Sequence, residues 1–226
     1  MIQLRRQQVS NRIEQACLAY GRPKDAVTLL AVSKTVDAQA VRAAFDDGQR
    51  QFGENYVQEG LSKIEALTDV RTQLQWHLIG PLQSNKTRVV AEHFDWVQTL
   101  DRLKIAQRLS EQRPTDLAPL NVLIQVNTSG EDSKSGVSPQ EVMALAQAVS
   151  QLPRLRLRGL MALPAPSDEQ AQQHSAHHLL KTLFDQLNAQ GLALDTLSMG
   201  MSADLEAAIA EGATMVRVGT ALFGAR

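Results

Sequence analysis

The sequence lacks the features that mark secreted, membrane-spanning or nucleic-acid-binding proteins. It has one cysteine, Cys17, in 226 residues, so no internal disulfide can form and a reducing, cytoplasmic compartment is expected. No apolar run approaches the roughly 18 residues of a membrane span, and the N-terminus has no apolar signal core. Lys and Arg number 23 against 24 Asp and Glu, a formal charge of −1. This balance indicates neither a nucleic-acid nor a membrane partner.

Apolar and amphipathic segments alternate along the chain. The segments predicted as strands are residues 27–33, 51–53, 75–79, 95–100, 120–127, 155–163, 195–199 and 215–218. A helical pattern follows each, the last as a single turn over 219–223, and an extra helix over 2–20 precedes them. Alternating strands and helices are typical of parallel βαβ units, and eight units favour a closed (β/α)8 TIM barrel. No linker or repeat divides the chain, so we expect a single α/β domain over residues 1–226.

Lys34 directly follows the first predicted strand, in which residues 29–32 form an unbroken apolar run. The carboxyl ends of barrel strands are where α/β barrels keep their chemistry. A desolvated lysine loses its proton readily and becomes a nucleophile. The alternative is a solvated lysine that merely closes the strand, and this segment alone does not decide between the two.

Two glycine-bearing loops, residues 198–202 and 217–220, follow the seventh and eighth predicted strands. In α/β barrels these loops often bind phosphate. Ser198, Ser202 and Thr220 offer hydroxyl groups, and Gly219 allows the backbone to approach a ligand closely. The alternative is that the hydroxyls are only helix caps and the glycines only turns. Two such loops at the two positions together favour a phosphate site.

Arg217 and Asn55 are the other polar residues predicted near this end of the barrel. Arg217 lies within the last strand, where its permanent charge needs a partner. That partner is either a carboxylate such as Glu54 or an anionic or heteroaromatic ligand. Asn55 follows the second strand, where it either caps a helix or hydrogen-bonds a ligand.

The histidines and one polar loop are weaker candidates for a functional role. His77 lies within the third predicted strand, where a satisfied core histidine is the more frequent case than a base. His174 and His178 are one helical turn apart, but no accompanying carboxylate motif indicates a metal, so we expect a solvated helix face and no metal site. The polar segment 127–136 is either a lid or a plain connection.

A strand-end lysine, two phosphate loops and an inward arginine together describe a site for a phosphorylated aldehyde. Pyridoxal 5′-phosphate (PLP) fits: Lys34 would form a Schiff base, the loops would hold the phosphate, and Arg217 would approach the pyridine ring. The chain also resembles the PLP homeostasis proteins of the YggS/PROSC type, related to the N-terminal barrel domain of alanine racemase. The resemblance rests on LAVSKT at 30–35, FGENY at 52–56, WHLIGPLQSNK at 76–86, GLMA at 159–162, LSMGMS at 197–202 and VRVGT at 216–220.

This resemblance implies a PLP barrel of fold type III in which Lys34 carries the cofactor as a covalent aldimine. It places Asn55 beside the ring, and Arg217 at the ring nitrogen or the phosphate. The residues that it places near the phosphate are Ser198, Ser202, Gly219 and Thr220. It further implies a role in vitamin B6 homeostasis and supply, with PLP-dependent apo-enzymes as recipients and no catalytic residue.

Three functions compete: a PLP carrier, a PLP-dependent amino-acid racemase of low activity, and a Schiff-base aldolase. Racemisation needs a base on each face of the α-carbon, or one base that swings from one face to the other. The resemblance to alanine racemase provides Lys34, but the opposing tyrosine and the C-terminal β domain are not expected here. Neither Tyr20 nor Tyr56 is obviously placed to serve. An aldolase would need an acid–base residue such as His77 or Glu54. We expect a monomeric, non-catalytic carrier.

Overall fold

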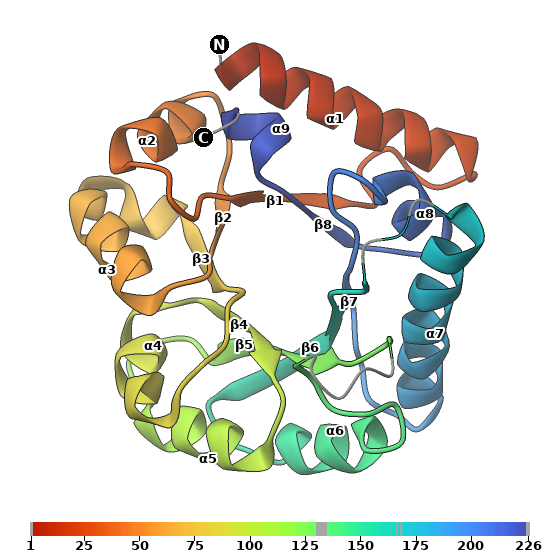
Figure 1. Cartoon of the computed structure of the whole chain (residues 1–226). Coiled ribbons are helices and arrows are strands. Elements are labelled where there is room, and N and C mark those ends of the chain that lie inside the picture. Colours follow the sequence, from red (N-terminus) through yellow and green to blue (C-terminus); the bar gives the residue numbers. More distant parts are fainter. Residues whose placement is uncertain (1, 130–134, 166, 168, 225–226) are drawn as a thin grey trace.

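Eight parallel strands close into a barrel in chain order, with β8 paired back to β1. The structure, a computed structural model, describes residues 2–129, 135–165, 167 and 169–224. Figure 1 shows the barrel with its helices around it. The strands are β1 (Thr28–Val32), β2 (Gln51–Glu54), β3 (Gln75–Leu78), β4 (Trp96–Leu100), β5 (Leu120–Val126), β6 (Leu155–Ala162), β7 (Thr196–Ser198) and β8 (Met215–Val218). The predicted (β/α)8 barrel is confirmed.

A helix follows every strand, and one more precedes the first. The α-helices are α1 (Ile2–Ala19), α2 (Ala38–Asp46), α3 (Val57–Ala66), α4 (Thr87–His93), α5 (Leu103–Gln112), α6 (Val142–Ser150), α7 (Gln170–Ala189), α8 (Leu205–Ala210) and α9 (Thr220–Phe223). Two 3-10 helices, η1 (Thr68–Gln73) and η2 (Ser84–Lys86), extend the connections before β3 and α4. In the described part of the chain, no helix combines the length and apolarity needed to cross a bilayer.

Helix α1 is the predicted addition to the ring. It buries one stripe, including Val9, Ile13 and Cys17, and Figure 1 shows it lying across α9 and reaching α8. Cys17 is fully buried and packs in the core. Leu4 and Tyr20, which are also apolar or aromatic, do not join this stripe and are 65% and 49% exposed.

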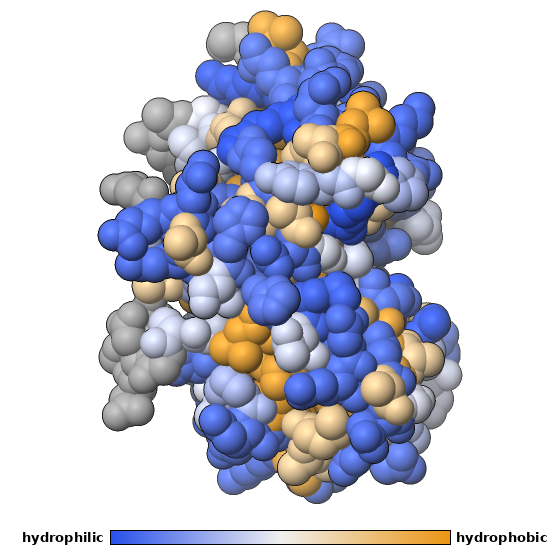
Figure 2. Space-filling view, turned by 90° about the vertical axis from the view of Figure 1, so that its right-hand side faces the viewer, coloured by the Kyte–Doolittle hydropathy of each residue, from blue (hydrophilic) through white to orange (hydrophobic). Residues whose placement is uncertain are grey.

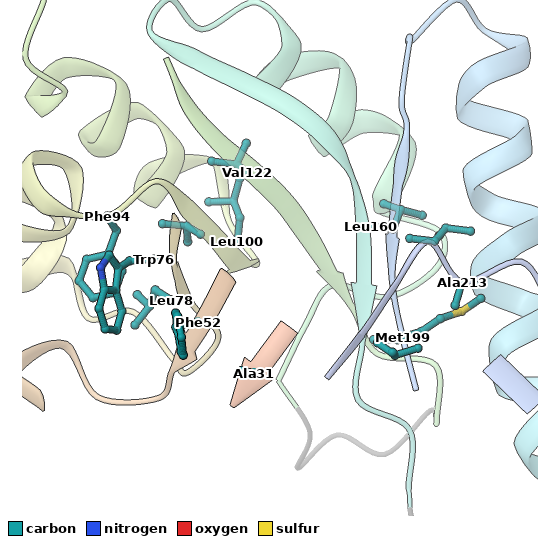
Figure 3. Close-up of a cluster of buried hydrophobic side chains, with 14 of the residues drawn as sticks. Ala31, Phe52, Trp76, Leu78, Phe94, Leu100, Val122, Leu160, Met199 and Ala213 are labelled. Carbon is teal, nitrogen blue, oxygen red and sulfur yellow. The ribbon is translucent and has the colours of Figure 1, made fainter. Parts of the chain in front are cut away.

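The hydrophobic core has an outer layer, between strands and helices, and an inner one inside the barrel. In the outer layer the Phe52 and Trp76 ring centroids lie 5.7 Å apart. Figure 3 shows both side chains in this cluster. Inside the barrel, Leu30 and Ile79 pack together. They meet over Gly53, where a Cβ atom would lie only 2.9 Å from Ile79 Cδ1. The glycine therefore leaves room for the inner layer below the site.

Two helices begin later than their sequences suggest, which leaves polar residues in the loops at the barrel mouth. Helix α3 begins at Val57 without a side-chain cap, so Asn55 is not its N-cap. Helix α8 begins at Leu205, and Ser202 lies in the turn before it. The alternative role of both residues as helix caps is therefore wrong. Asp37 does cap α2, since its carboxylate accepts from the Ala40 N–H at 2.7 Å.

Candidate functional site

A cavity of about 380 Å³ opens where the strands end. Carboxyl ends of strands are the edge at which α/β barrels bind ligands. Six of the seven residues predicted to bind a cofactor line this cavity, all except Ser198. The full lining is Val32, Lys34, Asn55, Ile79, Leu163, Met201, Ser202, Ala203, Arg217, Gly219 and Thr220.

Lys34 lies in a turn just beyond β1, two residues past the last strand residue. Its side chain is half-buried, and it shares the cavity wall with Val32, as strand alternation predicts. Among the described residues, its amine has no hydrogen-bond or ion-pair partner. The amine is therefore available to a ligand in the cavity.

Arg217 is a buried cation without a carboxylate partner among the residues described. Its Nη1 donates to Ser198 Oγ at 2.7 Å, and its Nη2 donates to the Ala162 carbonyl at 2.8 Å. Burial lowers the pKa of Arg217 to about 10, so it keeps its charge at neutral pH. The alternative pairing with Glu54 is wrong, because Glu54 pairs with Lys63 at 2.8 Å.

Ser198 lies behind Arg217 rather than on the cavity wall. Its hydroxyl is fully buried, accepts from Arg217 and donates to Gln98 Oε1 at 2.6 Å. Gln98 Nε2 in turn lies 2.9 Å from His77 Nδ1. A buried chain of polar side chains therefore fixes the guanidinium from inside the barrel.

The loop after β7 is held by contacts with two other parts of the chain and by one contact within the loop itself. The Gly200 carbonyl accepts from the Arg217 N–H at 3.0 Å, and Asp204 Oδ1 accepts from the Met201 N–H at 2.7 Å. On the outer side, the Ser202 carbonyl accepts from Arg12 Nη1 at 2.8 Å. Neither Arg12 nor Asp204 carries a sequence signal for this role, since both resemble ordinary surface charges.

Asp204 also joins this loop to α7. Its Oδ2 lies 2.9 Å from Nε2 of the buried His177. Burial alone would raise the pKa of Asp204, but hydrogen bonds from His177 and the Met201 N–H hold it below its ordinary value. Asp204 is therefore ionised at neutral pH, and its carboxylate connects the loop to α7.

The second glycine loop approaches β1 closely. A Cβ atom on Gly219 would lie 3.2 Å from the Val32 carbonyl oxygen, so glycine keeps this approach unstrained. Thr220 follows as the first residue of α9. The first N–H groups of a helix have no partner within it. Together with the Ser202 and Thr220 hydroxyls, these donors fit an anionic group next to Lys34 and Arg217.

The histidines lie outside this cavity. His77 is fully buried and stacks on Trp96 with centroids 5.0 Å apart. Burial lowers its pKa to about 3, so it is neutral, which confirms a core histidine. His174 and His178 lie 2.8 and 2.9 Å from the two carboxylate oxygens of Glu211. Within the described ranges, no group of three or more His, Cys, Asp or Glu residues is arranged to hold a metal ion.

The segment 127–136, predicted as a lid or a plain connection, lies partly outside the described residues, which omit 130–134. Its described end contributes one bridge, in which the Asn127 N–H donates to the Val137 carbonyl at 2.9 Å. This contact fixes where the segment leaves and rejoins the barrel.

Comparison with known proteins identifies the family. The family model for the alanine racemase N-terminal domain matches residues 7–226. A pyridoxal phosphate homeostasis protein of Pseudomonas aeruginosa is 63% identical over 218 residues, which cover 96% of this chain and 93% of the relative. One of Escherichia coli K12 is 58% identical over 220 residues, 97% of this chain and 94% of the relative. The chain belongs to the pyridoxal phosphate homeostasis protein family. The resemblance inferred from the six sequence stretches is thereby confirmed.

Solved structures agree with this family and its fold. PipY of Synechococcus elongatus with PLP bound is 38% identical, with a TM-score of 0.84 over 99% of this chain and 100% of PipY. An alanine racemase of Clostridium difficile is 16% identical, with a TM-score of 0.73 over 96% of this chain and 55% of the racemase. The second match concerns the fold alone, and it fits the barrel that the homeostasis protein family shares with alanine racemase.

Proposed function

We propose that the protein holds PLP in the 380 Å³ cavity as a Schiff base on Lys34 and serves in intracellular PLP homeostasis and supply. One observation carries the proposal: a single cavity brings together an amine with no partner among the described residues, a buried arginine and two glycine loops with hydroxyl groups. The names of the relatives and the PLP bound to PipY support the same cofactor.

Each of the six predicted residues in the cavity wall has a role in this proposal. PLP supplies an aldehyde that condenses with an amine and a ring that withdraws electrons. Lys34 provides the amine, and Asn55 contacts the ring. Ser202, Gly219 and Thr220 bind the phosphate, and Arg217 faces the ring nitrogen. Ser198 does not line the cavity, and we propose that it acts on the bound cofactor only through Arg217, whose guanidinium it holds.

The same cavity wall favours a PLP carrier over a PLP-dependent enzyme. A permanent cation at the ring nitrogen opposes protonation of that nitrogen and so weakens the ring as an electron sink. Racemisation by two bases would also need a second base opposite Lys34. Neither tyrosine is among the described residues of the lining, and Tyr56 is 62% exposed. The racemase alternative therefore has no second base in the described wall.

An aldolase is disfavoured by the two groups that would assist it. His77 is neutral and buried, with its Nδ1 against Gln98. Glu54 is buried, and its Oε1 accepts from both Ser33 and Lys63. Neither group lines the cavity, so neither can exchange a proton with a substrate bound to Lys34.

The experiment that tests the cofactor is borohydride reduction followed by mass spectrometry. We expect yellow protein with an absorption band near roughly 420 nm and a reduced pyridoxyl group on Lys34. The Lys34→Ala variant should lose the band, whereas Lys104→Ala, at an exposed position on α5, should keep it. Label on another lysine would contradict the proposal, and colourless protein that traps a sugar aldehyde would favour the aldolase.

Catalytic turnover is tested separately on the holo protein with single enantiomers of amino acids. Solvent deuterium that enters the α-position at a useful rate would favour the racemase. A carrier should instead pass PLP to PLP-dependent apo-enzymes, the recipients that we propose. Transfer is measured as activity regained by an apo-enzyme mixed with the holo protein, with Lys34→Ala as the control.

We also propose that the protein acts as a monomer in the cytoplasm. The side of the molecule that carries α7 is mostly hydrophilic, with one apolar area in its lower half and smaller ones above it (Figure 2). Large contiguous apolar patches are what stable interfaces need. Light scattering should give the mass of one chain, and twice that mass would contradict the proposal.

A further inference from the structure

Lys63, on α3, is a buried lysine that the cavity does not use. Its amine donates to the Ser33 carbonyl at 2.6 Å, to Glu54 Oε1 at 2.8 Å and to Glu59 Oε1 at 2.7 Å. The side chain is only 6% exposed. All three donor positions of the ammonium group are therefore used, and the pair with Glu59 is not an ordinary surface pair of a helix.

The acceptors of Lys63 reach the residues on both sides of Lys34. Ser33, directly before it, gives its carbonyl to Lys63 and donates its hydroxyl to Glu54 Oε1 at 2.5 Å. Thr35, directly after it, donates its N–H to the same Glu59 oxygen that binds Lys63. The peptides that flank Lys34 are thus fixed by one buried ammonium group.

The turn at Lys34 needs such restraint. Thr35 has a φ of +61°, a left-handed conformation that is costly for a β-branched residue and persists only when the surroundings hold it. The Thr35 hydrogen bond to Glu59 supplies that hold, and Lys63 keeps Glu59 in place. Without Lys63 the turn would relax toward negative φ and carry Lys34 with it.

Lys63 is the cation that balances the negative charges of Glu54 and Glu59 in this network. Burial raises the pKa of Glu54, and hydrogen bonds from Lys63 and Ser33 oppose that rise. Without the ammonium group, Glu54 and Glu59 would face each other with no cation between them. A buried charge that loses its partner moves toward solvent or takes up a proton. Either response would release Ser33 and Thr35.

We propose that Lys63 is a positioning residue that, through Ser33 and Thr35, fixes the turn presenting the Lys34 amine to the cavity and thereby sets how much bound PLP is in the Schiff base. Lys63 does not line the cavity, so its effect passes through the backbone at 33–35. This inference rests on the proposed function, since it concerns the aldehyde bond to Lys34.

The test separates the Schiff base from non-covalent binding. Lys63→Met is made in the wild-type chain and in the Lys34→Ala chain. The absorption near roughly 420 nm per bound PLP and the PLP dissociation constant are measured in each. The matched control is Lys181→Met, which removes a lysine from another i,i+4 pair, with Asp185 on α7, far along the chain from the turn.

We expect Lys63→Met to lower the Schiff-base fraction by about tenfold, because the Lys34 amine would no longer be held in position to bond to the PLP aldehyde. In the Lys34→Ala chain the same change should leave PLP affinity within about twofold, because Lys63 acts only through Lys34. Equal loss of affinity in both chains would indicate a merely structural role, and no change in either would overturn the proposal.

If Lys63→Met does not fold, the Glu59→Gln variant is used to test the proposal instead. This variant keeps the Lys63–Glu54 pair and weakens only the hold on Thr35, so the Schiff-base fraction should fall by a smaller factor. An unchanged fraction would overturn the proposal. If the wild-type and Lys181→Met proteins themselves lack the band, the proposed function fails, which is a different result from a band that Lys63 does not influence.

Discussion

Arg12 Nη1 donates a hydrogen bond to the Ser202 carbonyl 2.8 Å away, across 190 residues of sequence. The same guanidinium pairs with Glu206 in the first turn of α8 at 2.5 Å. Helix α1 thus holds the loop that carries one wall of the cavity, and Figure 1 shows it lying over the C-terminal elements. The extra helix is part of the site's support.

Removing this brace should weaken PLP binding. Arg12→Met deletes both contacts, and we expect the PLP dissociation constant to rise about fivefold, since a charged hydrogen bond in a partly exposed position contributes roughly 1 kcal/mol. Titration of the apo protein with PLP measures it. Arg42→Met is the control, because it breaks an exposed ion pair with Asp69 away from the cavity. Equal affinity of the Arg12 variant and wild type would contradict the prediction.

A second prediction concerns the hydroxyl behind Arg217. Ser198→Ala leaves Arg217 Nη1 without its buried acceptor, which should cost about 1–3 kcal/mol in unfolding free energy and raise the PLP dissociation constant. Ser110→Ala is the control, since it removes another buried hydroxyl bond, to the Pro153 carbonyl. It should lower stability without changing PLP affinity. The two variants are compared by urea unfolding and PLP titration, and an unchanged PLP affinity in Ser198→Ala would contradict the assignment.

The fold and most of the cavity wall could be predicted because both are local in sequence. Apolar runs mark each strand, and the barrel then brings all carboxyl ends to one edge. Lys34, Arg217 and the two glycine loops follow directly from strand ends, so the sequence places them together without any knowledge of packing. The six predicted residues found in the wall are of this kind.

The supporting residues could not be predicted, because their roles depend on contacts between distant parts of the chain. Glu59 and Lys63 are four residues apart and resemble a solvated helix pair, yet Lys63 is buried. Arg12 and Asp204 resemble surface charges for the same reason. Ser198 was predicted near the phosphate from its loop, whereas the register of β7 turns its hydroxyl behind Arg217.

A third prediction is a pH dependence at Asp204. Its pKa in the folded protein lies below the ordinary 3.8, so the folded state binds fewer protons than the unfolded state near that pH. The stabilisation is present above pH 3.8 and is lost as the pH falls through the folded pKa. Asp204→Asn keeps the shape and removes the charge.

The difference in Tm between wild type and Asp204→Asn should therefore be largest at neutral pH and narrow as the pH falls below 3.8. A difference of a few degrees is expected at neutral pH, since about 1 kcal/mol shifts Tm by roughly 2–4 °C in a chain of this size. Thermal unfolding followed by circular dichroism across this range measures it. A constant difference would mean that hydrogen-bond geometry, not charge, stabilises the loop.

The last prediction separates backbone strain from steric overlap at Gly200. This residue has a φ of +89°, and a Cβ atom would lie 2.5 Å from the Ala208 Cβ atom. Gly200→Ala should lower the unfolding free energy by about 2–5 kcal/mol, the sum of left-handed strain and overpacking. Gly21→Ala is the control, with a φ of +66° and open space around it. It should cost only about 1–2 kcal/mol, the strain alone.

Removing the Ala208 methyl group, which a Cβ atom at position 200 would overlap, separates the effect of strain from that of overlap. Ala208→Gly alone should cost about 1 kcal/mol, because glycine is unfavourable inside a helix. Combined with Gly200→Ala, it removes the overlap, so the double variant should lose less stability than the sum of the two single changes. The Gly200 carbonyl accepts from the Arg217 N–H, so Gly200→Ala should also weaken PLP binding. In the double variant, PLP affinity should recover together with stability. Additive losses would instead mean that φ alone requires glycine, and that the packing of α8 against the loop contributes nothing to the site.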